Sequence, residues 1–120
     1  MKRFSMALAA VAAVSGVTAA TAFAHVEYKS SSPGKGKTAS THITTVTVTF
    51  TGPIRKGTLK VTGPGGVTVS KGSGGRDPRK ISRVRVALKS GLTAGRYKAT
   101  WHVTAADGHK ETGSFTFKLK

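Results

Sequence analysis

The histidines and carboxylates of this 120-residue chain are few, and two of them stand only two residues apart. The chain has four His, four Asp or Glu and no cysteine. In Asp107-Gly108-His109 the spacing across a permissive glycine lets a carboxylate and an imidazole converge on one ion. An Asp-Gly pair is also ordinary for a hairpin turn between two strands. The motif is therefore a candidate half-site for a metal ion.

His25 would offer two ligands if the chain were cut directly before it. Residues 1–24 begin with a basic pair, continue as an Ala/Val-rich stretch and end in Ala22-Phe23-Ala24, a pattern typical of a signal peptidase site. Interspersed Ser, Thr and Gly dilute this stretch below the roughly 20 apolar residues of a spanning helix. We therefore expect a secretory signal peptide at 1–24 and a domain at 25–120, in which His25 presents an α-amine and a ring nitrogen.

The two half-sites together supply two or three nitrogens and one oxygen, which suits tetragonal Cu(II). Ni(II) and Zn(II) accept the same ligands, but the divalent affinity order places copper first. Both methionines precede residue 25, so residues 25–120 have no Met or Cys for Cu(I). We predict a site for one Cu(II), bound by His25, Asp107 and His109. Its affinity should weaken as pH falls, because the nitrogen ligands must lose protons.

The remaining histidines and acids have weaker claims to a role in this site. His102 follows Trp101 in an alternating segment and is expected on the opposite face, and His42 lies in a polar Thr/Ser segment. Asp77 precedes a proline and is typical of a turn. Glu27 and Glu111 lie near the proposed ligands, and Glu27 is a candidate extra ligand.

Apolar and polar residues alternate through much of residues 25–120, which is the pattern of half-buried β-strands. Gly63 to Gly66 predicts a tight hairpin turn, and Lys71 to Lys80 predicts a flexible loop. Beside a first strand just after His25, strands are expected over residues 45–50, 59–61, 67–69, 83–89, 97–103 and 115–119. We therefore expect an all-β fold, an immunoglobulin-like Greek-key β-sandwich or barrel of about seven strands.

The chain is strongly basic, with 20 Lys or Arg against four acids and a formal charge of +16. Lys2 and Arg3 are the only charged residues before position 25, so residues 25–120 carry +14. Such a charge predicts affinity for polyanions. No recognition-helix pattern or aromatic stacking platform accompanies it, which argues against nucleic acid. We expect contact with an anionic cell-envelope surface instead, either wall polymers or lipid headgroups.

Several stretches of residues 25–120 occur together in one known family. They are His25 after the cleavage site, Ser32-Pro33 with Gly36, the strand from Val46 to Ile54, Gly91-Leu92 with Gly95-Arg96-Tyr97, Trp101, and the run from Thr104 to Phe117. In these the chain resembles the CopC family of exported copper-resistance proteins. The resemblance implies a small Greek-key barrel or sandwich that holds Cu(II) through His25, by its amine and ring, with Asp107 and His109.

The resemblance also implies a non-enzymatic copper carrier that is periplasmic or secreted. A separate CopD-type membrane protein that takes copper inward would be its partner. The chain lacks the Met-rich loop with which some members hold Cu(I), so it is similar to the Cu(II)-only type. We expect a monomer.

Two other functions use part of the same sequence. A histidine-brace copper monooxygenase-like enzyme also has an N-terminal His amine on a β-sandwich, but Asp107 would occupy a position that dioxygen needs. A basic wall- or polyanion-binding immunoglobulin-like module would use the +14 charge and leave the histidines incidental. We take the copper carrier as the first hypothesis.

Overall fold

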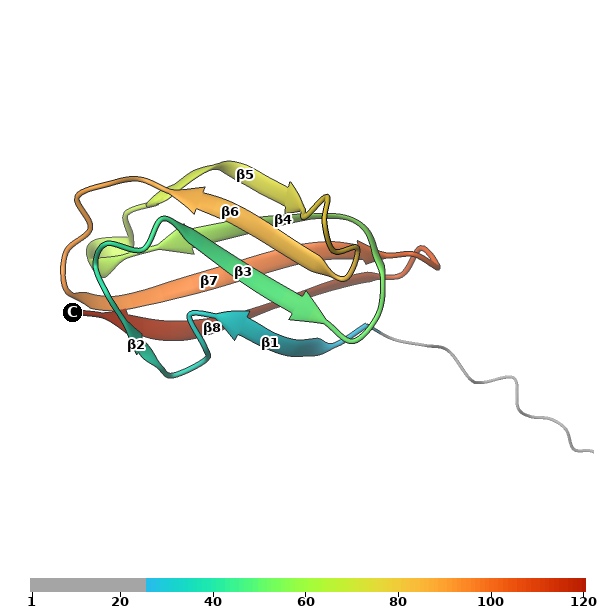
Figure 1. The fold of residues 1–120 in the computed structure, drawn as a ribbon, viewed down its shortest axis with the longest axis horizontal. Helices are drawn as coiled ribbons and strands as arrows, with labels where there is room; N and C mark the ends of the chain where they lie inside the picture. The colour runs from blue at the N-terminus through green and yellow to red at the C-terminus, as the bar shows by residue number, and fades with distance from the viewer. Residues whose placement is uncertain (1–25) are drawn as a thin grey trace, which may run out of the picture.

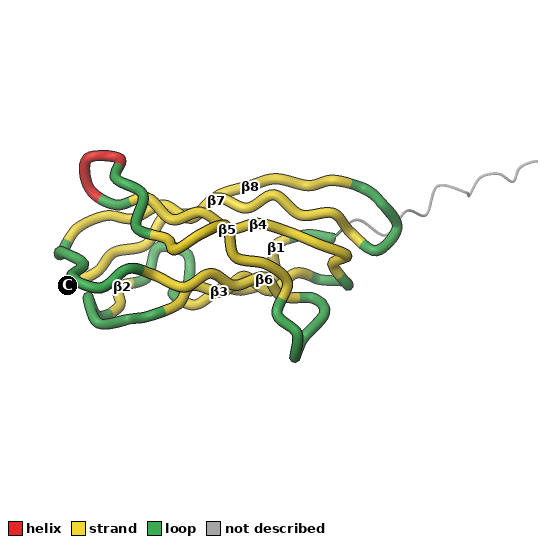
Figure 2. Tube along the Cα trace, turned by 90° about the horizontal axis from the view of Figure 1, so that it is seen from above, coloured by secondary structure: helices red, strands yellow, loops and turns green. Residues whose placement is uncertain are grey.

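The computed structural model describes residues 26–120 as two β-sheets packed face to face; in Figure 2 the strands labelled β7 and β8, of one sheet, lie above those labelled β3 and β6, of the other. One sheet has the strand order β1-β3-β6-β5, and the other has the order β2-β8-β7-β4 (Figure 1). The strands are β1 (Tyr28–Ser32), β2 (Thr38–Ala39), β3 (Thr45–Phe50), β4 (Ile54–Thr62), β5 (Ser70–Arg76), β6 (Arg83–Leu88), β7 (Gly95–Ala105) and β8 (Lys110–Leu119). The expected all-β sandwich is confirmed, and the described residues form eight strands, of which β2 has two residues.

The alternation of the sequence places one face of each long strand in the core. In β3, Val46, Val48 and Phe50 are buried, while the threonines between them are only partly buried. Trp101 of β7 lies in an aromatic group, with ring centroids 5.8 Å from Tyr28 and 5.6 Å from Phe50. The core is therefore shared by the two sheets.

Among residues 26–120, no helix is long and apolar enough to cross a bilayer.

Strands β7 and β8 form the longest antiparallel ladder of the fold. The ladder runs in register from Gly95 opposite Leu119 to Thr104 opposite Lys110. It ends in a short turn at one end of the sandwich, which projects beyond the other strands in Figure 1. The Asp107-Gly108-His109 motif occupies this turn.

The hairpin expected at Gly63 to Gly66 is present but short, since Gly63 N donates to Val67 O at 2.8 Å and Val69 N donates to Val61 O at 2.9 Å. A 3₁₀ turn, η2 (Pro64–Gly66), is followed by one isolated bridge between Thr62 and Thr68. The chain then crosses from the sheet of β4 to the sheet of β5. Val67, expected in a strand, is 62% exposed. Turn chemistry predicts a reversal of the chain but not the sheet that the next strand joins.

The flexible loop expected over Lys71 to Lys80 is also wrong, because residues up to Arg76 belong to β5. Gly72 and Gly74 adopt φ values of 68° and 66°, and the register with β6 shifts between Lys71 and Gly75. The strand is therefore irregular, which the polar and glycine-rich composition does reflect.

Asp77 forms the expected turn, in which its carboxylate accepts a hydrogen bond from Arg79 N at 2.9 Å. Its side chain is also buried, which the sequence did not indicate, and forms an ion pair with Arg83 at 3.1 Å. The bond from Arg79 N and the Arg83 guanidinium outweigh burial and lower the pKa of Asp77.

Candidate metal centre

The turn between β7 and β8 has a defined backbone conformation. Ala105 N donates to His109 O at 2.8 Å, and Gly108 N donates to Ala105 O at 2.9 Å. Gly108 has a φ of 95°, a conformation that side-chain-bearing residues rarely adopt. The glycine of the motif therefore allows the tight turn that places Asp107 and His109 on the same side.

Asp107 and His109 contact each other directly. Asp107 Oδ1 accepts a hydrogen bond from His109 N at 3.0 Å, and Asp107 Oδ2 lies 2.9 Å from His109 Nδ1. Both side chains remain accessible, with exposed fractions of 39% and 47% respectively. This arrangement orients the ring, and it leaves its other nitrogen, Nε2, directed away from the carboxylate.

The carboxylate of Asp107 is stabilised in its ionised form. The hydrogen bond from His109 N, followed by the one from the His109 side chain, lowers the pKa of Asp107 below the ordinary value. Asp107 is therefore an anion at neutral pH, and a carboxylate oxygen with lone pairs to spare is a hard ligand for a divalent ion.

The start of the described chain lies beside this turn. Val26 is buried, and it lines a hollow of about 160 Å³ together with Asp107, Ala106 and Pro53. Glu27 N donates to Thr51 Oγ1 at 3.0 Å, and Thr51 N donates to Glu27 O at 2.9 Å. His25 itself lies outside the described residues, as does the expected signal peptide at 1–24. The chain therefore enters the sandwich at the end that carries the Asp107 turn (Figure 1).

Arg55 supports the turn and was not singled out from the sequence. It is the extra residue of a register shift between Ile54 and Lys56 in β4. Its Nη2 donates to Ala106 O at 3.1 Å, while Ala106 N donates to Pro53 O at 3.1 Å. The β3–β4 connection thus holds the turn from the side. A β-bulge leaves no recognisable pattern in the sequence, so nothing there distinguished Arg55 from the other basic residues.

The other histidines lie away from the turn. His102 is exposed on β7 opposite Thr58 and Thr112, as expected for the outer face. His42 lies before β3, where its Nδ1 is 3.3 Å from Ser40 Oγ. Within residues 26–120, no three His, Asp or Glu side chains lie close enough together to hold a metal ion.

Glu27 and Glu111 line a second hollow next to Val26, together with Trp101. With Asp107, three of the four acids of the chain therefore lie around the point where the described chain begins. The acids of this strongly basic protein are thus concentrated at this end, where Lys35 lines the same hollow as Glu27 and Glu111.

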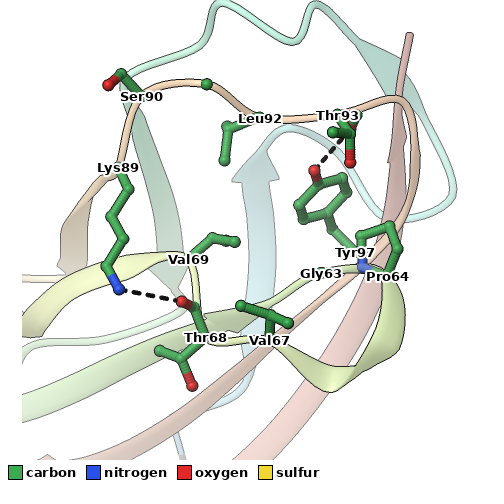
Figure 3. A pocket seen from close by; sticks show the side chains of 11 residues that line it. Gly63, Pro64, Val67, Thr68, Val69, Lys89, Ser90, Leu92, Thr93 and Tyr97 are labelled. Carbon is green, nitrogen blue, oxygen red and sulfur yellow. Dashed lines mark hydrogen bonds between the residues drawn. The ribbon is translucent and has the colours of Figure 1, made fainter.

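A pocket at the opposite end of the sandwich has a different character (Figure 3). It has a volume of about 280 Å³, and Val67, Val69 and Leu92 contribute apolar side chains to it. Tyr97 Oη donates to Thr93 O at 2.6 Å, and Lys89 Nζ donates to Thr68 O at 3.3 Å, as the dashed lines show. No His, Asp or Glu of the described residues lines this pocket.

The chain belongs to the CopC family, because the family model described as the CopC domain matches residues 28–120. The chain is 34% identical over 61 residues to Protein YobA of Escherichia coli (strain K12), which is 51% of this chain and 49% of that protein. It is 46% identical over 48 residues to Copper resistance protein C of Pseudomonas syringae pv. tomato, 40% of this chain and 36% of that protein. The chain thus aligns with half or less of the length of these curated relatives.

Solved structures give the same fold. CopC from Methylosinus trichosporium OB3b superposes with a TM-score of 0.67 and 20% identity over 80% of this chain and 94% of that chain. PcoC, a methionine rich copper resistance protein from Escherichia coli, has a TM-score of 0.67 and 24% identity over 81% of this chain and 100% of that chain. The expected family and its β-sandwich are therefore confirmed.

Proposed function

We propose that the protein is an exported carrier that binds one Cu(II) ion through His25, Asp107 and His109. Removal of residues 1–24 would expose the α-amine of His25, so that this residue contributes its amine and its ring. Asp107 would add an oxygen and His109 a third nitrogen. Three nitrogens and one oxygen form a ligand set for tetragonal Cu(II).

The observation that carries this proposal is the shared hollow of Val26 and Asp107. Consecutive Cα atoms are about 3.8 Å apart across a trans peptide, so the residue before Val26 starts within reach of the turn. The burial of Val26 and the hydrogen bonds between Glu27 and Thr51 fix that starting point. An α-amine at position 25 would thus be joined directly to Val26, which shares a hollow with Asp107.

The Asp107–His109 pair supports the same proposal through its hydrogen bonds. A carboxylate at 2.9 Å from Nδ1 favours the ring tautomer in which Nε2 is unprotonated and can bind a metal. An ion bound at Nε2 would lie on the side of the ring away from Asp107, so the carboxylate would have to leave Nδ1 before its oxygen could reach the same ion. We therefore infer that copper binding exchanges the Nδ1–Oδ2 hydrogen bond for two metal–ligand bonds.

A carrier role, rather than catalysis, follows from the family and from the site. A named relative and a solved neighbour are copper resistance proteins. A carboxylate among the ligands fills a coordination position that an oxygen-activating copper site would keep open. We infer that the protein carries Cu(II) outside the cytoplasm as a monomer, and that a CopD-type membrane protein is its partner.

The test is a Cu(II) titration of the chain that begins at His25, followed by electron paramagnetic resonance. A version with one Gly added before His25 keeps every side chain but moves the terminal amine away. We expect one tightly bound ion in the first protein and a loss of at least a hundredfold in affinity in the second. Equal and weak binding by both proteins would refute the proposal.

A matched pair of histidine variants tests the second half of the site. His109→Ala should abolish tight binding, whereas His102→Ala removes an exposed histidine from the same ladder and should bind copper like the parent. Equal losses in the two variants would mean that copper binds to scattered surface histidines.

A further inference from the structure

The outer face of the sheet formed by β2, β8, β7 and β4 carries a two-dimensional array of positive charges. Each of three adjacent strands contributes two basic residues, which alternate with buried residues and so point away from the core. They are Lys56 and Lys60 on β4, Arg96 and Lys98 on β7, and Lys110 and Lys118 on β8. We call these six residues the basic face.

The basic face carries an excess of positive charge, because only one of the four acids, all of them among the described residues, borders it. This acid is Glu111, which stands opposite Val103 and shares a hollow with Lys56 and Lys110. Asp77 is buried against Arg83 of the other sheet. Glu27 and Asp107 lie at the end of the sandwich, near Val26. Most of the negative charge therefore lies away from the basic face, at one end of the sandwich and in the other sheet.

The positions of these cations oppose the stability of the sheet. Arg96 lies directly opposite Lys118, and like charges in such cross-strand positions are destabilising. Thr104 is paired with Lys56 on one side and with Lys110 on the other. With His102, Lys56 and Lys110 line a shallow hollow of about 410 Å³ on this face. An arrangement that is unfavourable within the fold becomes favourable when an external anion covers it.

The shape of the basic face distinguishes between kinds of anion. The two cations of β8 lie roughly 26 Å apart along the strand, those of β4 roughly 13 Å and those of β7 roughly 7 Å, and three strands spaced by about 5 Å add the second dimension. The aromatic side chains of these strands are buried, so this face has no stacking platform for sugars or bases. The exposed large hydrophobics, Val67 and Ile81, lie outside the four strands of this sheet. A planar anion therefore matches the face better than a single polymer chain.

We propose that the basic face binds an anionic lipid bilayer, with the strands lying parallel to the membrane surface. The attraction is electrostatic, since the face inserts no apolar side chain, and salt therefore weakens it. In this orientation the turn with Asp107 and His109 lies at the rim of the contact and stays open to the side. Membrane binding and metal binding thus use separate surfaces.

The test uses the chain that begins at His25, which contains all eight strands and the described core. Vesicles with about 30% phosphatidylglycerol in phosphatidylcholine, and vesicles of phosphatidylcholine alone, are sedimented with the protein at about 0.05 M and about 0.5 M NaCl. One variant neutralises the face by Lys60→Gln, Lys98→Gln and Lys118→Gln. The matched control removes the same charge near the other sheet by Lys29→Gln, Lys71→Gln and Lys80→Gln.

We expect binding to the anionic vesicles alone, and release of the protein at the higher salt concentration. Each cation near an anionic surface contributes about a fivefold gain in affinity, so the face variant should bind about a hundredfold more weakly. The control should bind within a few fold of the parent. The face variant should also melt at or slightly above the temperature of the parent, because it removes the Arg96–Lys118 repulsion.

Two results would overturn the proposal. Equal losses in the two triple variants would show that only the net charge matters. Binding to soluble polyphosphate that depends on the face, without binding to the vesicles, would assign the face to a polymer. Neither result bears on the copper site, because both variants leave Asp107 and His109 unchanged and should bind Cu(II) as the parent does.

Discussion

Gly113 lies opposite Trp101 in the β7–β8 ladder, and the indole covers it. A Cβ added at position 113 would lie 2.8 Å from both Cε2 and Cη2 of that ring, and closer still to Cζ2. The ring cannot move aside freely, because it is enclosed by Tyr28, Phe50 and Phe115. Gly113→Ala should therefore force Trp101 out of its packed position.

The expected cost is that of overpacking a core, about 1–3 kcal/mol. For a domain of this size, each kcal/mol lowers the melting temperature by about 4–8 °C, so the loss should be about 5–20 °C. Thermal unfolding of the chain from His25, followed by circular dichroism and by fluorescence, measures it. Trp101 is the one tryptophan of the sequence, so the emission reports on this ring alone.

Gly75→Ala is the matched control for this experiment. Gly75 is also a strand glycine, but no heavy atom lies within 4 Å of a Cβ added there. Its melting temperature should stay the same or rise slightly, because alanine restricts the unfolded chain. A Gly113→Ala protein as stable as the control, with unchanged emission, would refute the packing described for Trp101.

Two further predictions concern pH. Copper binding should weaken as pH falls, because protons compete with the ion for the amine and imidazole nitrogens. The lowered pKa of Asp107 keeps its carboxylate ionised over this range, so Asp107→Asn should reduce the affinity without changing its dependence on pH. Copper titrations at several pH values would show both effects. Because the pKa of Asp77 is lowered, its ionised carboxylate stabilises the fold at pH values above the ordinary pKa of Asp. This stabilisation is lost as pH falls through the lowered pKa. Asp77→Asn should therefore flatten the acid side of a plot of melting temperature against pH, and an unchanged slope would contradict this.

The sequence predicted best where burial alone decides the structure. Strands β3, β6, β7 and β8 follow period-two patterns, because one face of each must be buried. It failed beyond Val69 in the β4–β5 connection, where the chain leaves the sheet of β4 and joins the other sheet. There the choice of sheet depends on long-range packing, which a turn motif does not encode.

The same division applies to the candidate site. The contact between Asp107 and His109 is local, and their spacing placed both residues in the candidate site. The role of Arg55 depends on a bulge in β4 and on a carbonyl 51 residues away, so no local pattern indicated it. The part of His25 stays a prediction, because this residue lies outside the described chain.

The irregularity of β5 bears on self-association. β5 is an edge strand, and a regular edge presents a row of unpaired N–H and C=O groups on which another chain can add a strand. The left-handed conformations at Gly72 and Gly74 and the shifted register break that row. At Gly74 no other residue is accommodated, because a Cβ there would collide with Arg85 O. The glycines that hid this strand in the sequence thus protect the sheet from aggregation through its open edge.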